Sequence, residues 1–126
     1  MLKKRVLFVD DDSSVLDGLR RVLRPMRQQW EMRFASRGRE ALEVLSECPC
    51  DVVVSEIHMP EMDGLVFLGE VAQRFPNVVR IVLSSEFDRQ RVSESIRITH
   101  QHLFKPCETN SLIATVARAC STESVG

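Results

Sequence analysis

Tyrosine is absent from this 126-residue sequence, tryptophan occurs once, and the hydrophobic run near the N-terminus is short. That run, Val6–Val9, follows a basic start and stops at Asp10. A membrane span needs about 20 apolar residues, and the apolar part of a signal peptide needs about 7–15. We therefore expect a cytoplasmic protein that has neither.

An excess of charge of either sign is also missing, because 17 basic residues stand against 18 acidic ones and the net charge is −1. Domains that bind nucleic acid or anionic membranes through bulk charge carry a clear positive excess. We expect this domain to contact neither directly.

The sequence has four cysteines, and their spacing does not suit zinc. Cys48 and Cys50 flank a single proline, whereas zinc motifs usually place about two to four residues between ligands, and no histidine follows at ligand spacing. The hydrophobic fraction of 44% is enough for a core without disulfides or a metal. We expect reduced thiols without a function.

Short apolar runs alternate with longer segments of helical period, which predicts one α/β domain with a parallel sheet covered by helices on both faces. The predicted strands are residues 6–9, 31–35, 51–55, 79–83 and 102–104. The predicted helices cover about residues 15–23, closed by Pro25, then 41–45, 65–75, a weak helix from about 88, and 112–120.

Two of these boundaries depend on little sequence information. The fourth helix rests on Val92 and Ile96 as its apolar support, starting near Asp88. Residues 121–126 are polar, so we assign the domain to residues 1–120 and expect a frayed tail after it.

Polar side chains follow four of the predicted strands at the point where each strand ends. In a doubly wound sheet a site is expected at these carboxyl ends, where the strand order switches. The residues are Asp10, Asp11 and Asp12 after the first strand, Ser55 and Glu56 at the third, Ser84 and Ser85 at the fourth, and Lys105 at the fifth.

This set of side chains suits a hard cation together with a phosphate-like anion. Carboxylates and a backbone carbonyl hold Mg²⁺, while the metal and an ammonium group neutralise a phosphoryl group and a hydroxyl donates to it. Taken singly, each residue has a simpler explanation. Asp12, Ser13 or Ser14 would cap a helix, and Lys105 alone would be a solvated lysine.

Four sequence blocks resemble the signature blocks of the receiver (CheY-like) domain of two-component response regulators, in the same order, over about residues 4–119. They are Val9–Asp12, Ile57–Gly64, Leu83–Ser84 and Phe104–Pro106. The resemblance implies a flavodoxin-like five-stranded parallel sheet in the order 2-1-3-4-5. It also implies a role in phosphorelay signal transduction, without enzymatic turnover of a substrate.

The resemblance also assigns roles to single residues. Asp10 and Asp11 match the acidic pocket. Asp11, the residue at position 56 and the backbone carbonyl of His58 match the Mg²⁺ ligands. Ser84 matches the hydroxyl that binds the phosphoryl group, Lys105 the lysine that pairs with it, and His102 the switch aromatic. The Lys105–Pro106 bond is a candidate for the cis form.

The chain departs from the family at the phosphoacceptor position, where Glu56 replaces aspartate. Its carboxylate lies about 1.5 Å further along, and a misplacement of about 1 Å can slow in-line attack on the order of 100-fold. We expect poor or absent phosphorylation, weaker Mg²⁺ binding, and a carboxylate pushed toward Ser84 and Lys105 in imitation of a phosphoryl group. A natural pseudo-receiver and an engineered Asp-to-Glu variant both account for the residue.

One expected partner is a histidine kinase or a phosphotransfer protein. The other is an output domain, attached or separate, which we expect to bind the face made by the fourth helix, the fifth strand and the last helix. A second copy of the chain is a further candidate. The segment Gln101–Cys107 resembles receivers fused to HDOD or HD-type output domains.

Two other functions compete with signalling. One is a Mg²⁺-dependent phosphotransferase or phosphatase, although the chain offers no substrate-cap insertion and no Walker or Gly-x-Gly-x-x-Gly loop. The other is an interaction domain with a dead site, in which Glu56→Gln would leave partner binding unchanged.

Overall fold

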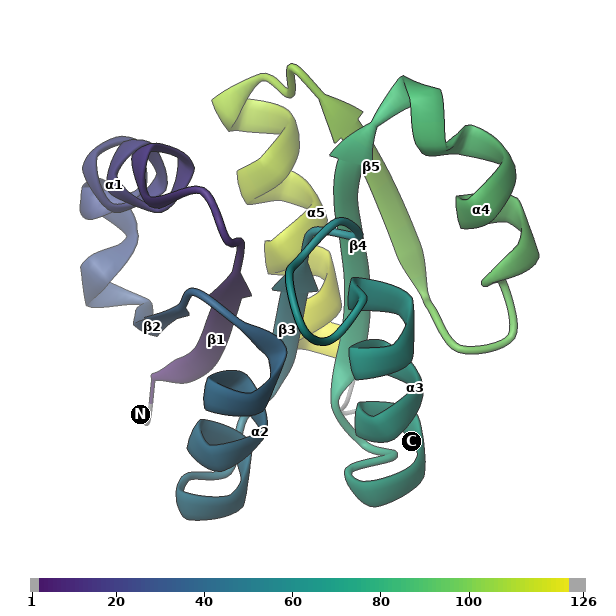
Figure 1. The fold of residues 1–126 in the computed structure, drawn as a ribbon. Coiled ribbons are helices and arrows are strands. Elements are labelled where there is room, and N and C mark those ends of the chain that lie inside the picture. The colour runs from purple at the N-terminus through teal and green to yellow at the C-terminus, as the bar shows by residue number, and fades with distance from the viewer. Residues whose placement is uncertain (1–2, 123–126) are drawn as a thin grey trace.

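Five parallel strands form a single sheet in the order β2-β1-β3-β4-β5, in the computed structural model, which describes residues 3–122 (Figure 1). This confirms the predicted α/β class and the strand order. The strands are β1 Lys4–Val9, β2 Trp30–Ala35, β3 Val52–Ser55, β4 Val79–Ser85 and β5 Gln101–Lys105. In register, Val9 lies beside Ser55 on β3, so the carboxyl ends of the central strands meet at one edge of the sheet.

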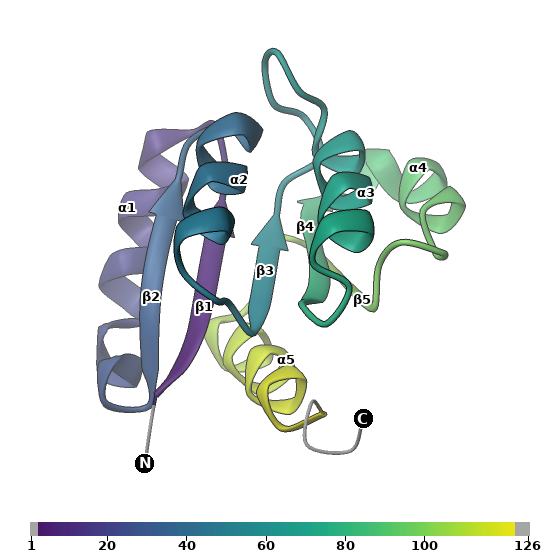
Figure 2. The ribbon, with the colours of Figure 1, turned by 90° about the horizontal axis from the view of Figure 1, so that it is seen from below.

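Helices cover both faces of the sheet, as Figure 2 shows for α2 and α3 on one face and α5 on the other. The helices are α1 Ser13–Val22, α2 Gly38–Glu47, α3 Gly64–Arg74, α4 Arg89–Glu94 and α5 Thr109–Thr122, with short 3-10 helices η1 Arg24–Gln28 and η2 Glu86–Asp88. Within this described range, no helix is long and apolar enough to cross a membrane.

Alternating side chains of the strands build two separate cores, because successive residues of a strand point to opposite faces. On β1, Leu7 and Val9 pack with α2 and α3, whereas Val6 and Phe8 pack with α1 and α5. All four are at most 2% exposed, which explains why this strand reads as a continuous apolar run.

The predicted support of the fourth helix is only half right. Val92 is buried, but Ile96 is 75% exposed and lies beyond the end of α4. The helix stops early because the Ser95 hydroxyl donates to the carbonyl oxygen of Val92 at 2.6 Å and competes with helix continuation. Ile98, two residues further on, packs against the core in its place.

Two helix ends differ from the sequence-based boundaries. α1 ends at Val22, and Pro25 stands inside the following η1. α5 continues through Thr122, so the predicted domain boundary at residue 120 falls within a helix. The rest of the predicted tail, residues 123–126, lies outside the described residues.

A buried arginine ties β4 to the segment that precedes β5. Arg80 donates from Nε to the carbonyl oxygen of Ile98 at 2.7 Å and from Nη1 to that of Val78 at 2.9 Å. Its backbone N–H donates to Nδ1 of His100 at 2.9 Å. Partial burial and, after it, the nearby positive charge of Arg80 lower the pKa of His100.

This contact predicts that acid weakens the fold through His100. The folded pKa lies below the unfolded value of about 6.5, so the unfolded chain binds the proton more readily. The contribution is therefore present above about pH 6.5 and is lost as the pH falls toward the folded pKa. Urea unfolding from pH 8 to pH 5 should show a smaller loss of stability for His100→Gln, whose amide oxygen can still accept from Arg80. The exposed His102→Gln is the control, and equal pH dependence in both variants would contradict the assignment.

Candidate functional site

The ends of three strands bring two carboxylates and an ammonium group together. Nζ of Lys105, on β5, lies 2.9 Å from Oδ2 of Asp10 and 2.7 Å from Oε1 of Glu56. The Asp10 and Glu56 side chains are only 6% and 12% exposed. The predicted convergence of these residues therefore holds for Asp10, Glu56 and Lys105.

Opposing effects set the charge state of Lys105. Burial by itself lowers the pKa of the ammonium group, whereas the hydrogen bonds and charges of Glu56 and Asp10 raise it, and the net shift is upward. The lysine is thus held in its charged form by two carboxylates, which are themselves compensated by one positive charge.

Both oxygens of the Glu56 carboxylate are engaged. Oε1 accepts from Lys105, and Oε2 accepts from the backbone N–H of Ile57 at 2.6 Å. Ser84 Oγ is fully buried and has no hydrogen-bond partner among the described residues. The expectation that the longer side chain reaches toward Ser84 and Lys105 is therefore met only at Lys105, because the other oxygen turns back to the chain.

The three consecutive aspartates take different positions. The other carboxylate oxygen of Asp10, Oδ1, accepts from the N–H of Asp12 at 2.9 Å. Asp12 caps α1 by accepting from the N–H and hydroxyl of Ser14, which lower the pKa of its carboxyl. The simpler helix-cap explanation is correct for Asp12. Asp11 is exposed at the rim and accepts no hydrogen bond from the described residues.

The loop between β3 and α3 is tied to η2 and to α4 by a hydrogen bond and an ion pair that the sequence did not indicate. Nε2 of His58 lies 2.6 Å from Oδ1 of the buried Asp88, and Nη2 of Arg91 lies 2.9 Å from both carboxylate oxygens of Asp63. The His58 imidazole is directed to Asp88. No spacing motif marks these pairs, since 28 to 30 residues separate the partners.

Gly64 closes the same loop against the back of Glu56. Its N–H donates to the carbonyl oxygen of Ile57 at 2.6 Å. A Cβ atom at this position would lie 1.9 Å from the backbone oxygen of Glu56 and 2.7 Å from Cα of Ile57. Only glycine allows this approach, so Gly64 positions the site although it offers no side chain.

His102, the candidate switch residue, lies away from the acid–lysine cluster. It is exposed on β5, and its ring meets the ring of Phe104 edge-on at 5.4 Å. The guanidinium of Arg89 lies over the Phe104 ring, 5.0 Å from the ring centroid. A groove between α4 and β5 is lined by Arg89, Gln90, Val92, Ser93, His102 and Phe104.

The oxygen atoms around the cluster fit Mg²⁺ only in part. Among the described residues no three acidic, histidine or cysteine side chains are grouped as a metal site. Mg²⁺ often takes one or two carboxylates together with waters, and Asp11 offers an exposed carboxylate that accepts no hydrogen bond from the described residues. Glu56 is a less available ligand, because both of its oxygens are already bonded. The Lys105–Pro106 bond beside the cluster is cis, as predicted.

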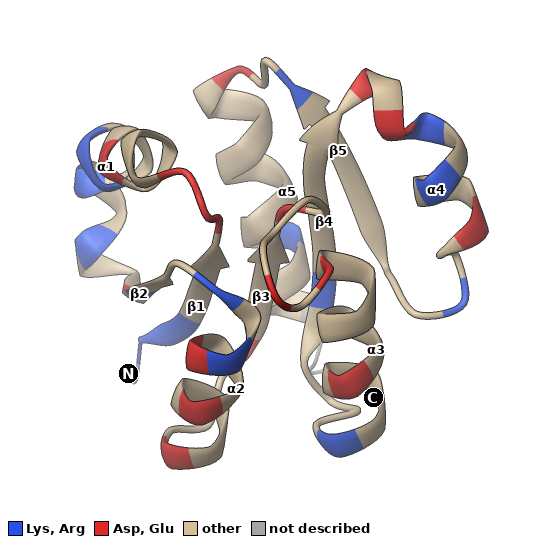
Figure 3. Cartoon of the chain, viewed as in Figure 1, with Lys and Arg blue, Asp and Glu red and all other residues tan. Residues whose placement is uncertain are grey.

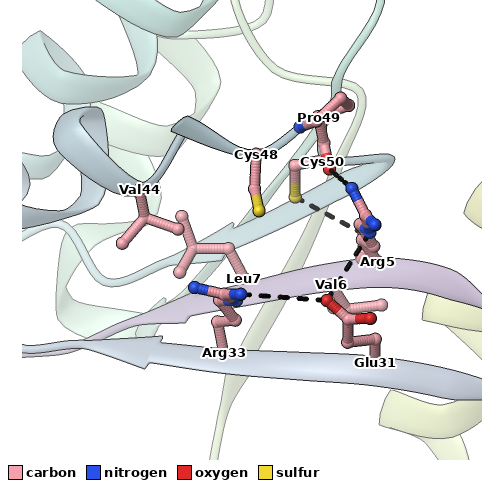
Figure 4. Close-up of a pocket in the computed structure, with 9 residues that line it drawn as sticks. All are labelled: Arg5, Val6, Leu7, Glu31, Arg33, Val44, Cys48, Pro49 and Cys50. Atoms are coloured by element: carbon pink, nitrogen blue, oxygen red, sulfur yellow. Dashed lines mark hydrogen bonds and ion pairs between the residues drawn. The ribbon is translucent and has the colours of Figure 1, made fainter. Parts of the chain in front are cut away.

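Cys48 and Cys50 lie at the other end of the sheet, where Figure 4 shows them above β1. No disulfide joins the four cysteines, which all lie within the described residues. The Cys50 Sγ donates to the carbonyl oxygen of Val52 at 3.2 Å, and burial raises the pKa of this thiol to about 12. A protonated, buried thiol is unreactive, in agreement with the prediction of reduced cysteines.

A flavodoxin-like sheet that carries acids and a lysine at its carboxyl edge defines an α/β signalling domain. The family model of the response regulator receiver domain matches residues 6–117, and the chain belongs to this family. Receiver domains are generally non-catalytic signalling modules that bind Mg²⁺ at an acidic phosphoacceptor site. Response regulators interact with histidine kinases or phosphotransfer proteins and with output domains.

Curated relatives are longer proteins. The chain is 32% identical over 95% of its length to the hydrogenase transcriptional regulatory protein HoxA of Cupriavidus necator. It is 35% identical over 92% of its length to the DNA-binding transcriptional regulator NtrC of Escherichia coli. It spans 25% and 24% of these two proteins, respectively.

Solved structures share the complete fold. The signal receiver domain of an HD domain-containing protein from Pseudomonas fluorescens superposes with a TM-score of 0.92 at 26% identity, covering 99% of this chain and all of that one. A CheY-like receiver from Methanospirillum hungatei has a TM-score of 0.89 at 20% identity, covers 98% of both chains, and supports the fold alone. The first of these agrees with the predicted likeness to receivers of HD-type proteins.

Proposed function

We propose that this chain is a phosphorelay receiver in which Glu56 occupies the phosphoacceptor position and partly imitates the phosphorylated state. The observation that carries the proposal is the bridge from Lys105 to Glu56 and Asp10, at 2.7 and 2.9 Å. An unphosphorylated receiver already carries an aspartate carboxylate at this position, so the imitation rests on the reach of the longer side chain to the lysine that the resemblance pairs with the phosphoryl group.

The imitation is partial because the attraction between Glu56 and Lys105 is smaller than the free energy that a complete switch requires. At 4 Å and an effective dielectric of 20, a Glu–Lys attraction is about 4 kcal/mol before desolvation is subtracted. Moving a two-state equilibrium from 1:99 to 99:1 takes about 5.5 kcal/mol. The unpartnered hydroxyl of Ser84 also supports an incomplete imitation, since a phosphoryl oxygen would be expected to accept from it.

Mg²⁺ would be held by Asp11, by the His58 backbone carbonyl and, at reduced strength, by Glu56. When bound, the ion neutralises negative charge at the site. The residues themselves do the rest: Asp10 keeps Lys105 charged and in place, Ile57 orients the Glu56 carboxylate, and Ser84 offers a buried donor. We propose no turnover of a substrate.

The partners we propose are a histidine kinase or phosphotransfer protein, an attached or separate output domain, and a second copy of the chain. The groove between α4 and β5 supports an output surface on the α4–β5–α5 face. Phe87 and Ile96 border α4 and are 100% and 75% exposed, so they offer apolar side chains to a partner at this face. The likeness to a receiver from an HD domain-containing protein makes an HD-type output domain a reasonable attachment.

Phosphorylation of the purified chain tests the proposal. After incubation with acetyl phosphate and Mg²⁺, we expect the intact mass to stay unchanged, whereas the Glu56→Asp variant should gain one phosphoryl group. The shorter side chain restores the attack distance that Glu56 overshoots by about 1.5 Å. A stable phosphoryl group on Glu56 itself would refute the proposal, and an unmodified Glu56→Asp variant would show that the site is inactive for another reason.

A further inference from the structure

Three exposed arginines at the end of α1 and in η1 lack acidic partners. Arg21, Arg24 and Arg27, here called the arginine patch, form no ion pair within residues 3–122. The preceding Arg20, by contrast, bonds to Asp17 at 3.0 Å and lies over the ring of Phe34 at 4.5 Å. Guanidinium groups with open donors are suited to carboxylates of a partner.

The outer surface of α2 carries the opposite charge. Glu40, Glu43 and Glu47, here called the acidic stripe, are exposed and lie on the side of α2 away from its buried residues. Their spacing of three and four residues places them in one row of about 10 Å, similar to the length of the arginine patch. In the described part of the chain, neither Glu43 nor Glu47 pairs with a cation.

The patch and the stripe border the same edge of the sheet. β2 is the terminal strand, with α1 packed on one face of the sheet and α2 on the other. In Figure 3 the basic segments of α1 and η1 and the acidic segments of α2 all lie on the β2 side of the molecule. Both helices run against the strand direction, so Arg24 and Glu47 lie near the same end of the strands.

We infer that the β2 edge is an interface for a second copy of this chain. A two-fold axis parallel to β2 exchanges the two faces of the sheet, and it therefore sets the arginine patch of each copy against the acidic stripe of the other. The contact is made twice, as in an isologous dimer. A nucleic acid is a poorer occupant, because the acidic stripe beside the patch repels phosphates.

This inference names the surface through which the second copy in the proposed function would bind. It rests on the proposed function only in taking a second copy of the chain as a partner. The patch lies at the amino ends of the strands, whereas Glu56 lies at their carboxyl ends. Phosphorylation of Glu56 would overturn the proposed function and would leave the charge contacts of this interface unchanged.

Sedimentation equilibrium with two charge-reversed variants tests the interface. We expect the chain to self-associate at low salt and to dissociate as salt shortens the screening length from about 10 Å at 0.1 M to about 3 Å at 1 M. Arg24→Glu/Arg27→Glu and Glu43→Lys/Glu47→Lys should each associate at least about tenfold more weakly, because like charges then face each other. An equimolar mixture of the two variants should regain association, which also shows that both are folded.

A matched control separates this edge from other surfaces. Arg97→Glu/Arg118→Glu makes the same change in net charge on exposed residues near α4 and in α5, and it should associate like the unmodified chain. A monomeric chain at low salt, a mixture that fails to regain association, or an equal loss in the control would overturn the inference. Binding of a short DNA duplex, lost in Arg24→Glu/Arg27→Glu and without self-association, would assign the arginines to nucleic acid instead.

Discussion

Replacing Gly64 by alanine is expected to destabilise the fold by about 3 kcal/mol or more, at the upper end of what overpacking costs. The new Cβ would lie 1.9 Å from the backbone oxygen of Glu56 and 2.8 Å from its carbonyl carbon, so main chain must move to admit it. That movement also strains the 2.6 Å bond from the Gly64 N–H to Ile57. Urea unfolding at pH 7 measures the loss directly.

Gly18→Ala is the matched control for this prediction. A Cβ at Gly18 meets nothing within 4 Å, and the residue lies inside α1. Alanine is favoured over glycine in a helix by about 0.8–1.0 kcal/mol, so this variant should become more stable by roughly that amount. A Gly64→Ala protein as stable as the unmodified chain would contradict the prediction. It would mean that the backbone of the loop behind Glu56 can move to admit the new Cβ atom at little cost in free energy.

The order of the elements could be predicted from the sequence because apolar residues at buried positions recur in patterns typical of strands and helices. β1 and β3 are covered on both faces and read as apolar runs, and the polar residues that interrupt them mark the strand ends. Parallel pairing then brings Asp10, Glu56 and Lys105 to one edge without any knowledge of side-chain conformation. The fold and the composition of the cluster follow from such local patterns.

Side-chain direction and long-range pairing could not be predicted in the same way. Glu56 was expected near Ser84, but a single rotamer choice turns its second oxygen to the Ile57 N–H and leaves the serine hydroxyl without a partner. Ile96 fits the helical period of Val92, yet Ser95 ends the helix first. The bond between His58 and Asp88 joins the loop after β3 to η2, two segments that lie 30 residues apart in the sequence.

Replacing Lys105 by methionine should cost about 3 kcal/mol at neutral pH, the lower end for breaking a buried ion pair, since the lysine side chain is 28% exposed. The substitution removes the one cation that compensates Asp10 and Glu56, which are 6% and 12% exposed. Two carboxylates left together without a cation repel each other.

The pH dependence of Lys105→Met distinguishes this electrostatic cost from a packing defect. Protonation of either carboxylate removes their repulsion in the folded variant, so its deficit should shrink as the pH falls from 7 to 5. Glu56→Gln in the same background removes one of the uncompensated charges, and it should restore stability at pH 7 by at least about 1 kcal/mol. A deficit that is equal at both pH values and unaffected by Glu56→Gln would mean that Lys105 stabilises the fold through its aliphatic stem alone. The bridge from Lys105 to Glu56 and Asp10 would then contribute no free energy, and the partial imitation of phosphorylation that depends on it would be refuted.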